Sequence, residues 1–302
     1  MKFGIWPNAV RAWKDIQTLV VHCDRAGWYS AYLTDHLMEA SDTEHTELPS
    51  IDCWAGLTAL AVVTKNIRLG SLVSPISFRH PSLLAKTASS AHVISNGRIT
   101  LGIGAGWQAR EHEAFGLHLP NVSERLDRLE EASALIASLL SQDHATLSGK
   151  YYKLNNASCK PRLTEPPVRL LVGGGGERRT MAIAARYADE WNAWFPLTEY
   201  GRKSALLDQY CEAAGRDPKA VHRSTQAYLR ITRDDPYLST PFTHGRPVLR
   251  GTPAQVLEQV STYATTTIGE LIIRDTGTIS IEAQIEMCDV FMDEVVRPLQ
   301  LG

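Results

Sequence analysis

The sequence is short of several features that would assign it to a particular class of protein. It has 31 basic and 33 acidic residues among 302, a formal net charge of −2. This balance offers no electrostatic footprint for nucleic acid or for an anionic membrane surface. The five cysteines are widely scattered and include no CxxC pair, a pattern that predicts reduced thiols in a cytoplasmic protein rather than a disulfide framework or a zinc ribbon.

Long apolar runs are also missing. The longest, such as Leu57–Val63, fall far short of the roughly 20 residues that cross a bilayer. The N-terminal run Lys2–Trp6 has no signal-peptide h-region or cleavage site, so neither export nor membrane insertion is expected. With 44% hydrophobic residues, the composition is that of a globular protein with ample core, and a small molecule is the expected partner.

Strand-like runs alternate with amphipathic helical segments along the whole chain, the pattern of parallel βα units. Counting these units gives eight. The sequence therefore predicts one (β/α)8 TIM barrel over residues 1–302, with loop insertions at the C-terminal face. The predicted strands are Lys2–Trp6, Ala31–Asp35, Ile67–Ser74, Ile99–Ala105, Val168–Gly173, Asp189–Ala193, Ser224–Ile231 and Leu271–Arg274.

Helix periodicity and capping signals support the count. Ser123–Ser141 carries leucines and isoleucine at i, i+3, i+4 spacing, which predicts an amphipathic helix. Thr252 to Gln255 has the pattern of a capping box with proline at the first helical position. Gly149–Leu154 is interpreted as a short hairpin. Three connections are longer than usual for βα loops and are expected to build the active site: Thr34–Pro49, Gly106–Val122 and Thr232–Gly251.

Four consecutive glycines, Gly173–Gly176, separate the fifth strand from the helix predicted over Glu177–Ala188. Backbone amides and a helix N-terminus would converge here, which suits a phosphate. A tight turn that merely needs positive φ is the alternative. The run is neither a P-loop nor a GxGxxG fingerprint, so it does not indicate Rossmann-type nucleotide binding.

Alternating glycines end the fourth strand, in Gly102–Trp107. They would let a flat ring system lie against the backbone, with Trp107 as a wall, or they would relieve crowding in the barrel core. This segment alone does not decide between the two.

Asp35 and His36 follow the second strand and so lie at the C-terminal mouth, where ionisable residues are often functional. A histidine there can exchange a proton near neutral pH. Capping of the next segment, or pairing of the two with each other, is the alternative. Glu111, His112 and Glu113 have metal-ligand side chains but do not form HExxH, so no metal site is predicted.

Taken together, these segments resemble the luciferase-like flavin and deazaflavin oxidoreductases, and the resemblance runs along nearly the whole chain. The stretches that carry it, in order, are Gly27–His36, Phe78–Pro81, Gly97–Trp107, Glu124–Glu131, Gly173–Arg179 and Arg186–Asn192. The subgroup that the chain most resembles uses the deazaflavin coenzyme F420, a two-electron hydride carrier; FMN is the alternative cofactor.

The resemblance implies roles for particular residues. Asp35 and His36 would face the coenzyme ring, and His36 would transfer the proton that accompanies the hydride. Ser71 and Leu72 match a position where many members carry a non-proline cis peptide behind the ring. The remaining matches are Ala105 and Gly106 at the polar edge of the ring, with Trp107 beside them, and Gly174, Gly175 and Gly176 at the phosphate.

One residue departs from the family pattern. In the sugar-phosphate dehydrogenase branch an acidic residue follows the Gly-x-Gly, whereas Trp107 stands there in this chain, which argues against that substrate. The leading hypothesis is hydride transfer between F420 and a small organic substrate. A monooxygenase that uses reduced FMN and a non-catalytic flavin- or deazaflavin-binding protein are the alternatives. The family resemblance also implies a homodimer.

Overall fold

The computed structural model describes residues 1–38, 49–232 and 246–301 and contains a closed barrel of eight parallel strands. Strand β1 pairs with β12 on one side and with β2 on the other, and β9 pairs with β10 to close the circle. The prediction of a (β/α)8 barrel is confirmed. Its strands are β1 (Lys2–Trp6), β2 (Ser30–Leu33), β3 (Arg68–Ser71), β5 (Ile99–Gly104), β8 (Arg169–Gly173), β9 (Glu190–Asn192), β10 (His222–Ile231) and β12 (Glu270–Arg274).

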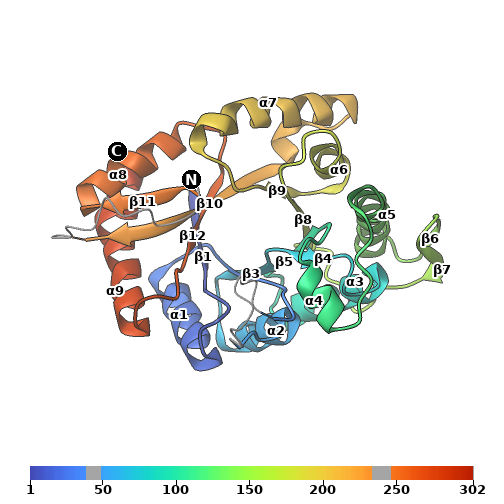
Figure 1. Ribbon diagram of the computed structural model, residues 1–302, viewed down its shortest axis with the longest axis horizontal. Helices are drawn as coiled ribbons and strands as arrows, with labels where there is room; N and C mark the ends of the chain where they lie inside the picture. Colours follow the sequence, from blue (N-terminus) through green and yellow to red (C-terminus); the bar gives the residue numbers. More distant parts are fainter. Residues whose placement is uncertain (39–48, 233–245, 302) are drawn as a thin grey trace.

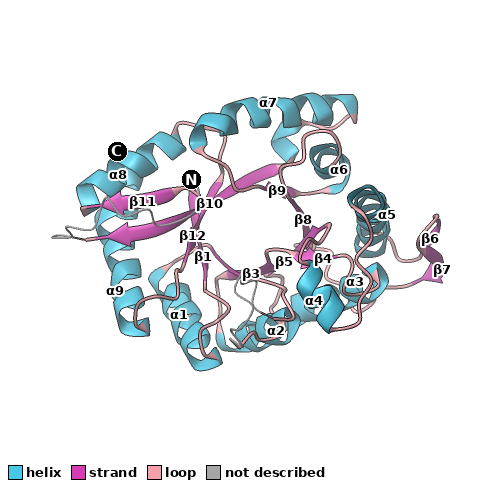
Figure 2. Cartoon of the chain, viewed as in Figure 1, coloured by secondary structure: helices cyan, strands magenta, loops and turns pink. Residues whose placement is uncertain are grey.

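Helices cover the outside of the barrel on all sides (Figure 1), and the strands surround its centre (Figure 2). Leu129, Leu135 and Ile136 of α5 are fully buried, as the helical stripe predicted. Thr252 and Gln255 form the reciprocal capping box at the start of α8. The helices are α1 (Trp13–Ala26), α2 (Cys53–Val63), α3 (Pro81–Ile94), α4 (Ala109–Ala114), α5 (Val122–Ser141), α6 (Thr180–Tyr187), α7 (Leu197–Ala213), η1 (Pro218–Ala220), α8 (Pro253–Ala264), α9 (Ile281–Val290), η2 (Phe291–Val296) and α10 (Arg297–Leu301).

Four of the described strands lie outside the barrel circle. The two-residue β4 (Ser74–Pro75) pairs with β5. Strand β11 (Val248–Gly251) extends β10 in parallel, within a segment predicted as loop. The expected hairpin exists as β6 (Ala145–Ser148) and β7 (Lys153–Ala157), so the predicted range Gly149–Leu154 spans its turn and the start of β7. Parts of the predicted long loops, 39–48 and 233–245, lie outside the described residues.

Two apolar layers hold the barrel together. A large cluster fills the space between strands and helices, and a smaller one inside the barrel contains Trp6, Tyr32, Leu72, Leu171 and Ile272. The five cysteines, all within the described ranges, are buried and none forms a disulfide. Among the described residues, no helix is long and apolar enough to cross a membrane.

Candidate active site

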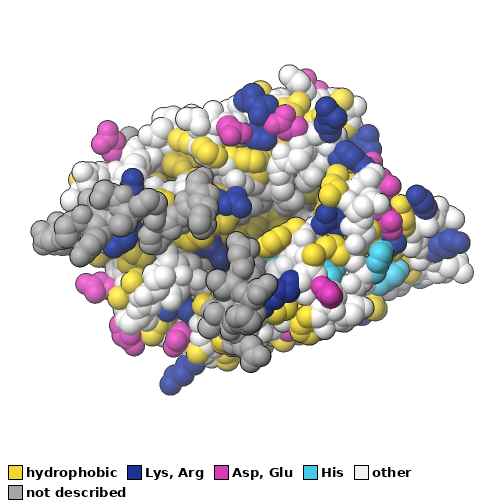
Figure 3. All heavy atoms as spheres, viewed as in Figure 1, with side chains coloured by type: hydrophobic (Ala, Val, Ile, Leu, Met, Phe, Trp, Pro, Cys, Tyr) yellow, Lys and Arg dark blue, Asp and Glu magenta, His cyan; other side chains and the backbone are white. Residues whose placement is uncertain are grey.

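A cavity of about 390 Å³ opens at the C-terminal ends of the barrel strands. Figure 3 shows hydrophobic side chains around a hollow near the centre of the face in view. Its walls come from segments far apart in sequence, which the barrel brings to one end. The lining residues are Trp6, Asn8, Ala9, Val10, Thr34, His36, Ser50, Leu72, Val73, Pro75, Gly106, Trp107, Trp194, Tyr228, Arg246 and Arg274.

His36 lies on the wall of this cavity in a fixed orientation. Its Nδ1 is 3.0 Å and 3.1 Å from the two carboxylate oxygens of Glu111. The same carboxylate accepts a hydrogen bond of 3.1 Å from the backbone N–H of Leu37, and Glu111 is 1% exposed. A carboxylate at Nδ1 selects the tautomer in which Nδ1 carries the proton, because only that form can donate to it. Nε2 is then the nitrogen that can accept a proton.

Trp107 supports the same ring from another side. Its indole meets the His36 imidazole edge to face, with ring centroids 5.8 Å apart, while 64% of the Trp107 side chain is exposed. An exposed tryptophan at a cavity mouth leaves a large apolar surface for a ligand.

Asp35 is placed differently from its neighbour. Its side chain is 1% exposed and is not among the cavity-lining residues. It accepts a hydrogen bond of 2.7 Å from Arg79, whose second nitrogen binds Asp52 at 2.7 Å. Burial raises the pKa of Asp35, and the charge of Arg79 together with a hydrogen bond from Ser74 partly offsets this. The two neighbours therefore have different places: Asp35 is ion-paired behind the cavity wall, and His36 lies on the wall.

The segment after β3 forms a bulge behind the cavity. A non-proline cis peptide joins Leu72 to Val73, one bond later than the Ser71–Leu72 position expected from the resemblance. Leu72 and Val73 both line the cavity. Ser71 lies beneath them and is fully buried, and its hydroxyl donates to the carbonyl of Gly102 at 2.8 Å.

The alternating glycines of β5 accommodate this bulge. A Cβ at Gly102 would overlap the carbonyl oxygen of Ser71, and one at Gly104 would lie 2.7 Å from Val73 Cγ2. Gly173 on β8 has the same neighbour, because a Cβ there would lie 2.7 Å from Val73 Cγ1. Of the two interpretations of the β5 glycines, relief of crowding accounts for Gly102 and Gly104.

Gly106, in contrast, reaches the cavity itself. Its φ of +80° favours glycine, and its carbonyl accepts a hydrogen bond of 2.6 Å from Arg125. Ala105 is half-buried beside it and is not among the lining residues.

The four-glycine turn lies between β8 and α6, next to the cavity but outside its lining. The amide of Gly174 donates to the carbonyl of Asn192 at 2.9 Å, and its φ is +122°. In the described part of the chain no hydrogen bond engages the amides of Gly175 and Gly176. A Cβ at Gly175 would overlap the Phe195 ring. The turn therefore requires glycine at positions 174 and 175, and the phosphate interpretation of the run stays a prediction.

Basic and aromatic side chains form another part of the cavity wall. The Arg274 guanidinium lies 3.9 Å above the Trp6 ring and 6.0 Å from that of Trp194. Burial lowers the pKa of Arg274, and its Nη1 is buried without a hydrogen-bond partner among the described residues. Arg246 stacks on the other side of the wall, 4.5 Å from the Trp194 ring. Such a wall favours a polar or negatively charged group on a bound molecule.

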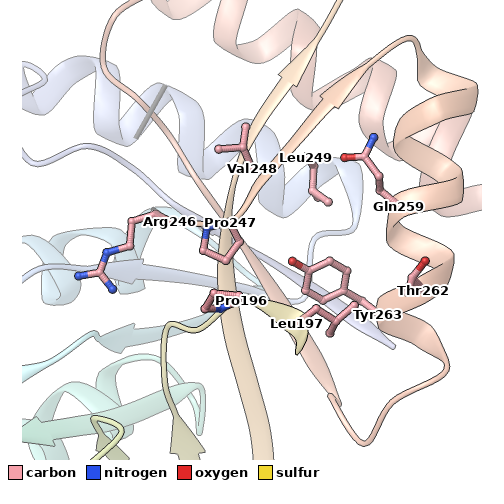
Figure 4. A pocket seen from close by; sticks show the side chains of 9 residues that line it. All are labelled: Pro196, Leu197, Arg246, Pro247, Val248, Leu249, Gln259, Thr262 and Tyr263. Carbon is pink, nitrogen blue, oxygen red and sulfur yellow. The ribbon is translucent and has the colours of Figure 1, made fainter. Parts of the chain in front are cut away.

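Arg246 also borders a second cavity, of about 470 Å³, between β11 and α8. In Figure 4 its guanidinium points away from the apolar and neutral side chains of that cavity, which include Leu249, Gln259 and Tyr263. The described residues that line this β11–α8 cavity include no histidine and no carboxylate that could move a proton. The cavity with His36 is therefore the candidate active site.

Sequence reasoning missed three partners in this site. The sequence pattern singles out Glu111 only as a possible metal ligand, because a spacing of 75 residues to His36 gives no local signal of their contact. Trp194 and Arg274 each follow or end a predicted strand, and that position at the barrel mouth is the signal that could have singled them out. His112, by contrast, is engaged within the protein, since its ring nitrogens bind Ser77 at 2.7 Å and the Gln108 carbonyl at 2.7 Å.

Comparisons with known proteins establish the family. The family model described as luciferase-like monooxygenase matches residues 1–237, and the chain therefore belongs to that family. An F420-dependent hydroxymycolic acid dehydrogenase of Mycobacterium tuberculosis is 30% identical over 224 residues, covering 72% of this chain and 59% of the relative. An F420-dependent glucose-6-phosphate dehydrogenase of Amycolatopsis mediterranei is 28% identical over 229 residues, 73% of this chain and 66% of the relative. The chain thus spans about three-fifths of the length of these curated relatives.

Among solved structures, an F420-dependent secondary alcohol dehydrogenase in complex with an F420–acetone adduct superposes with a TM-score of 0.85 and 17% identity. The match covers 99% of this chain and 98% of that one. At this identity the likeness concerns the fold, which it supports over the full barrel.

Proposed function

We propose that the protein is an F420-dependent oxidoreductase that transfers a hydride between the deazaflavin and a small organic substrate such as an alcohol or a carbonyl compound. The observation that carries the proposal is the His36–Glu111 pair, in which the imidazole lies on the wall of the cavity and the buried carboxylate holds it from behind. The names of the two curated relatives given above, both F420-dependent dehydrogenases, support the choice of coenzyme.

The residues present fit such a coenzyme. The bulge at Leu72–Val73 and the positive-φ turn at Gly106 offer a smooth surface on one side of the cavity. The amides of Gly175 and Gly176 lie at the neighbouring strand end, where backbone donors suit a phosphate. In this proposal Gly174 shapes the turn, and the amides of Gly175 and Gly176 bind the phosphate of the coenzyme. When bound, the deazaflavin supplies the hydride donor or acceptor.

The protein supplies the proton chemistry. Oxidation of an alcohol removes a hydride from carbon and a proton from oxygen, and carbonyl reduction returns both. In the proposed role, Nε2 of His36 accepts the hydroxyl proton as the C–H bond breaks and returns it in the reverse direction. Glu111 holds the ring in the tautomer that makes this possible and stabilises the imidazolium that forms. Asp35, ion-paired behind the wall, fixes the segment that carries His36 and acts as a positioning residue.

Apolar walls assist this transfer by excluding water. Trp6, Trp107 and Trp194 line the cavity, and in the proposed complex the bound molecules displace water from between these rings, which strengthens each charged hydrogen bond there. The exposed indole of Trp107 stands where the sugar-phosphate dehydrogenases carry an acid. We therefore expect substrates other than sugar phosphates.

Titration of the purified protein with F420 and, separately, with FMN tests the coenzyme, because both are fluorescent and their signals change on binding. Micromolar binding of F420 with weaker binding of FMN is expected, followed by bleaching of F420 absorbance with an alcohol from a small panel. If the protein fails to bind F420, the proposal is refuted. Transfer of one oxygen atom from O2 to a substrate in the presence of reduced FMN would instead identify a monooxygenase, and tight F420 binding with no turnover on any panel would identify a carrier.

A further inference from the structure

Three metal-ligating side chains meet at the N-terminal end of the barrel, opposite the cavity that contains His36. Glu190, His222 and Glu270 are the first residues of the neighbouring strands β9, β10 and β12. In the strand register, His222 lies beside Glu190. One ligand atom from each of the three lies within 4.8 Å of the other two.

The cluster is buried and incompletely bonded. Glu190 is 1% exposed and Glu270 is 0% exposed. Glu270 Oε2 and His222 Nε2 are buried atoms without a hydrogen-bond partner in the described part of the chain, and the 3.7 Å between them is too long for a hydrogen bond. Polar atoms buried without a partner are costly, which makes a missing ligand the simplest account of this arrangement.

The two carboxylates of the cluster favour a cation between them. Glu190 and Glu270 are both buried carboxylates, and a ligand atom of each lies within 4.8 Å of the other. Arg169 forms no ion pair with either carboxylate among the described residues, and its Nη1 donates to the hydroxyl of Tyr29 at 3.0 Å. Two carboxylates that repel each other in a buried site are stabilised when a metal ion lies between them.

Surrounding groups orient the carboxylates and make room for the imidazole. The hydroxyl of Ser30 donates to Glu270 Oε1, and that of Ser224 donates to Glu190 Oε1 at 2.9 Å. These bonds engage one oxygen of each carboxylate, and the other oxygen remains for a metal ion. Residues that orient metal ligands commonly bond to them in this way. Gly269 accommodates the imidazole, since a Cβ there would overlap the His222 ring.

A route from solvent leads to the cluster. His222 is 25% exposed in its side chain and lines an outer cavity of about 490 Å³ together with Asp208, Glu212 and Asp217. Lys219 and Arg223 line the same cavity, and Arg223 is ion-paired with Asp208, so the cavity offers access from solvent rather than an acidic surface.

We propose that Glu190, His222 and Glu270 bind one divalent transition-metal ion at the base of the barrel. One imidazole nitrogen with two carboxylate oxygens is a donor set suited to Zn²⁺ or Mn²⁺, with water completing the coordination. The ion would tie together three adjacent strands where the barrel closes. Its role is structural, because the cluster lies at the opposite end of the strands from His36.

Calorimetric titration of the chelator-treated full chain with ZnCl2, and electron paramagnetic resonance with MnCl2, test the proposal. We expect one ion per chain and a higher Tm in its presence. Glu270→Gln and His222→Ala should each weaken binding by about 100-fold or more, since even an outer partner of a ligand costs about 10–100-fold. The matched control is Glu212→Gln, an exposed acid at the cavity entrance, which should leave the affinity within about threefold because its charge is screened.

Each alternative result has a defined meaning. The absence of any bound ion in the wild type overturns the proposal, because a shared proton then satisfies the cluster. Equal loss of affinity in Glu212→Gln and Glu270→Gln overturns it too, since binding is then a property of the acidic surface. Should Glu270→Gln fail to fold, Glu190→Gln and His222→Ala provide the same comparison.

Discussion

Substitution Glu111→Gln tests the proposed proton chemistry most sharply. The change keeps the size of the side chain and one acceptor oxygen, but it removes the charge that faces Nδ1 of His36 at 3.0 Å. The amide can also present its N–H₂ to the ring and so favour the wrong tautomer. Hydrogen bonds to charged groups contribute about 1.5–3 kcal/mol. At about 1.4 kcal/mol per factor of ten, the proton-coupled step should slow by about 10- to 150-fold.

The assay is the single-turnover rate of F420 reduction with an alcohol that the wild type oxidises, alongside the Kd for F420. We expect the rate to fall and the Kd to stay within about threefold, because the lost interaction acts on the transition state rather than on coenzyme binding. Glu113→Gln, an exposed position on the same helix α4, is the matched control and should behave as the wild type.

A double variant separates positioning from general damage. If Glu111 acts only through His36, His36→Ala combined with Glu111→Gln should be no slower than His36→Ala alone, because coupled residues are not additive. The reasoning would be refuted if the double variant were slower than His36→Ala by the full factor that Glu111→Gln alone causes. It would also be refuted if Glu111→Gln and Glu113→Gln slowed the rate equally.

The remaining predictions concern stability. Gly102→Ala places a Cβ against a backbone oxygen of the bulge and should lower the free energy of unfolding by about 1–3 kcal/mol, measured by urea denaturation. Gly201→Ala, in α7 with nothing within 4 Å of the added Cβ, should instead raise it by about 0.5–1 kcal/mol; a loss at this position would contradict the helix-propensity argument. Hydrogen bonds from Arg202 and Lys203 lower the pKa of Glu177 to about 2. Because the folded pKa lies below the unfolded one, Glu177 stabilises the fold above its ordinary pKa of 4.5, and this is lost as the pH falls toward 2. The Tm difference between wild type and Glu177→Gln should therefore shrink from about pH 6 to about pH 3, and a constant difference would show that packing, not charge, is responsible.

The strands and helices were predictable because their signals are local. A run such as Arg169–Gly173 or the stripe along Val122–Ser141 carries its own periodicity. Strand β11 was missed because only four residues pair with β10 at the barrel edge. Its pairing depends on a neighbour that the sequence pattern does not specify.

The site was only partly predictable, and the reason is distance along the chain. The position of His36 at a strand end was readable, but its contact with Glu111 depends on where α4 packs. Likewise, Glu190 and Glu270 are far apart in sequence and meet only because β10 lies between their strands. Asp35 and His36 share a strand end and so carry the same sequence signal, although successive side chains of an extended segment point in opposite directions.

The contact of Val73 with Gly102, Gly104 and Gly173 has a consequence for attempts to redesign the cavity. A single branched side chain from one strand end occupies the space left open on two others. A larger residue at Gly104 or Gly173 is therefore compatible only with a smaller one at position 73, whereas Gly102 is also fixed by the backbone oxygen of Ser71. Libraries that vary positions 73, 104 and 173 one at a time should return mostly destabilised proteins, whereas paired changes that conserve their total volume give access to new shapes of the cavity wall.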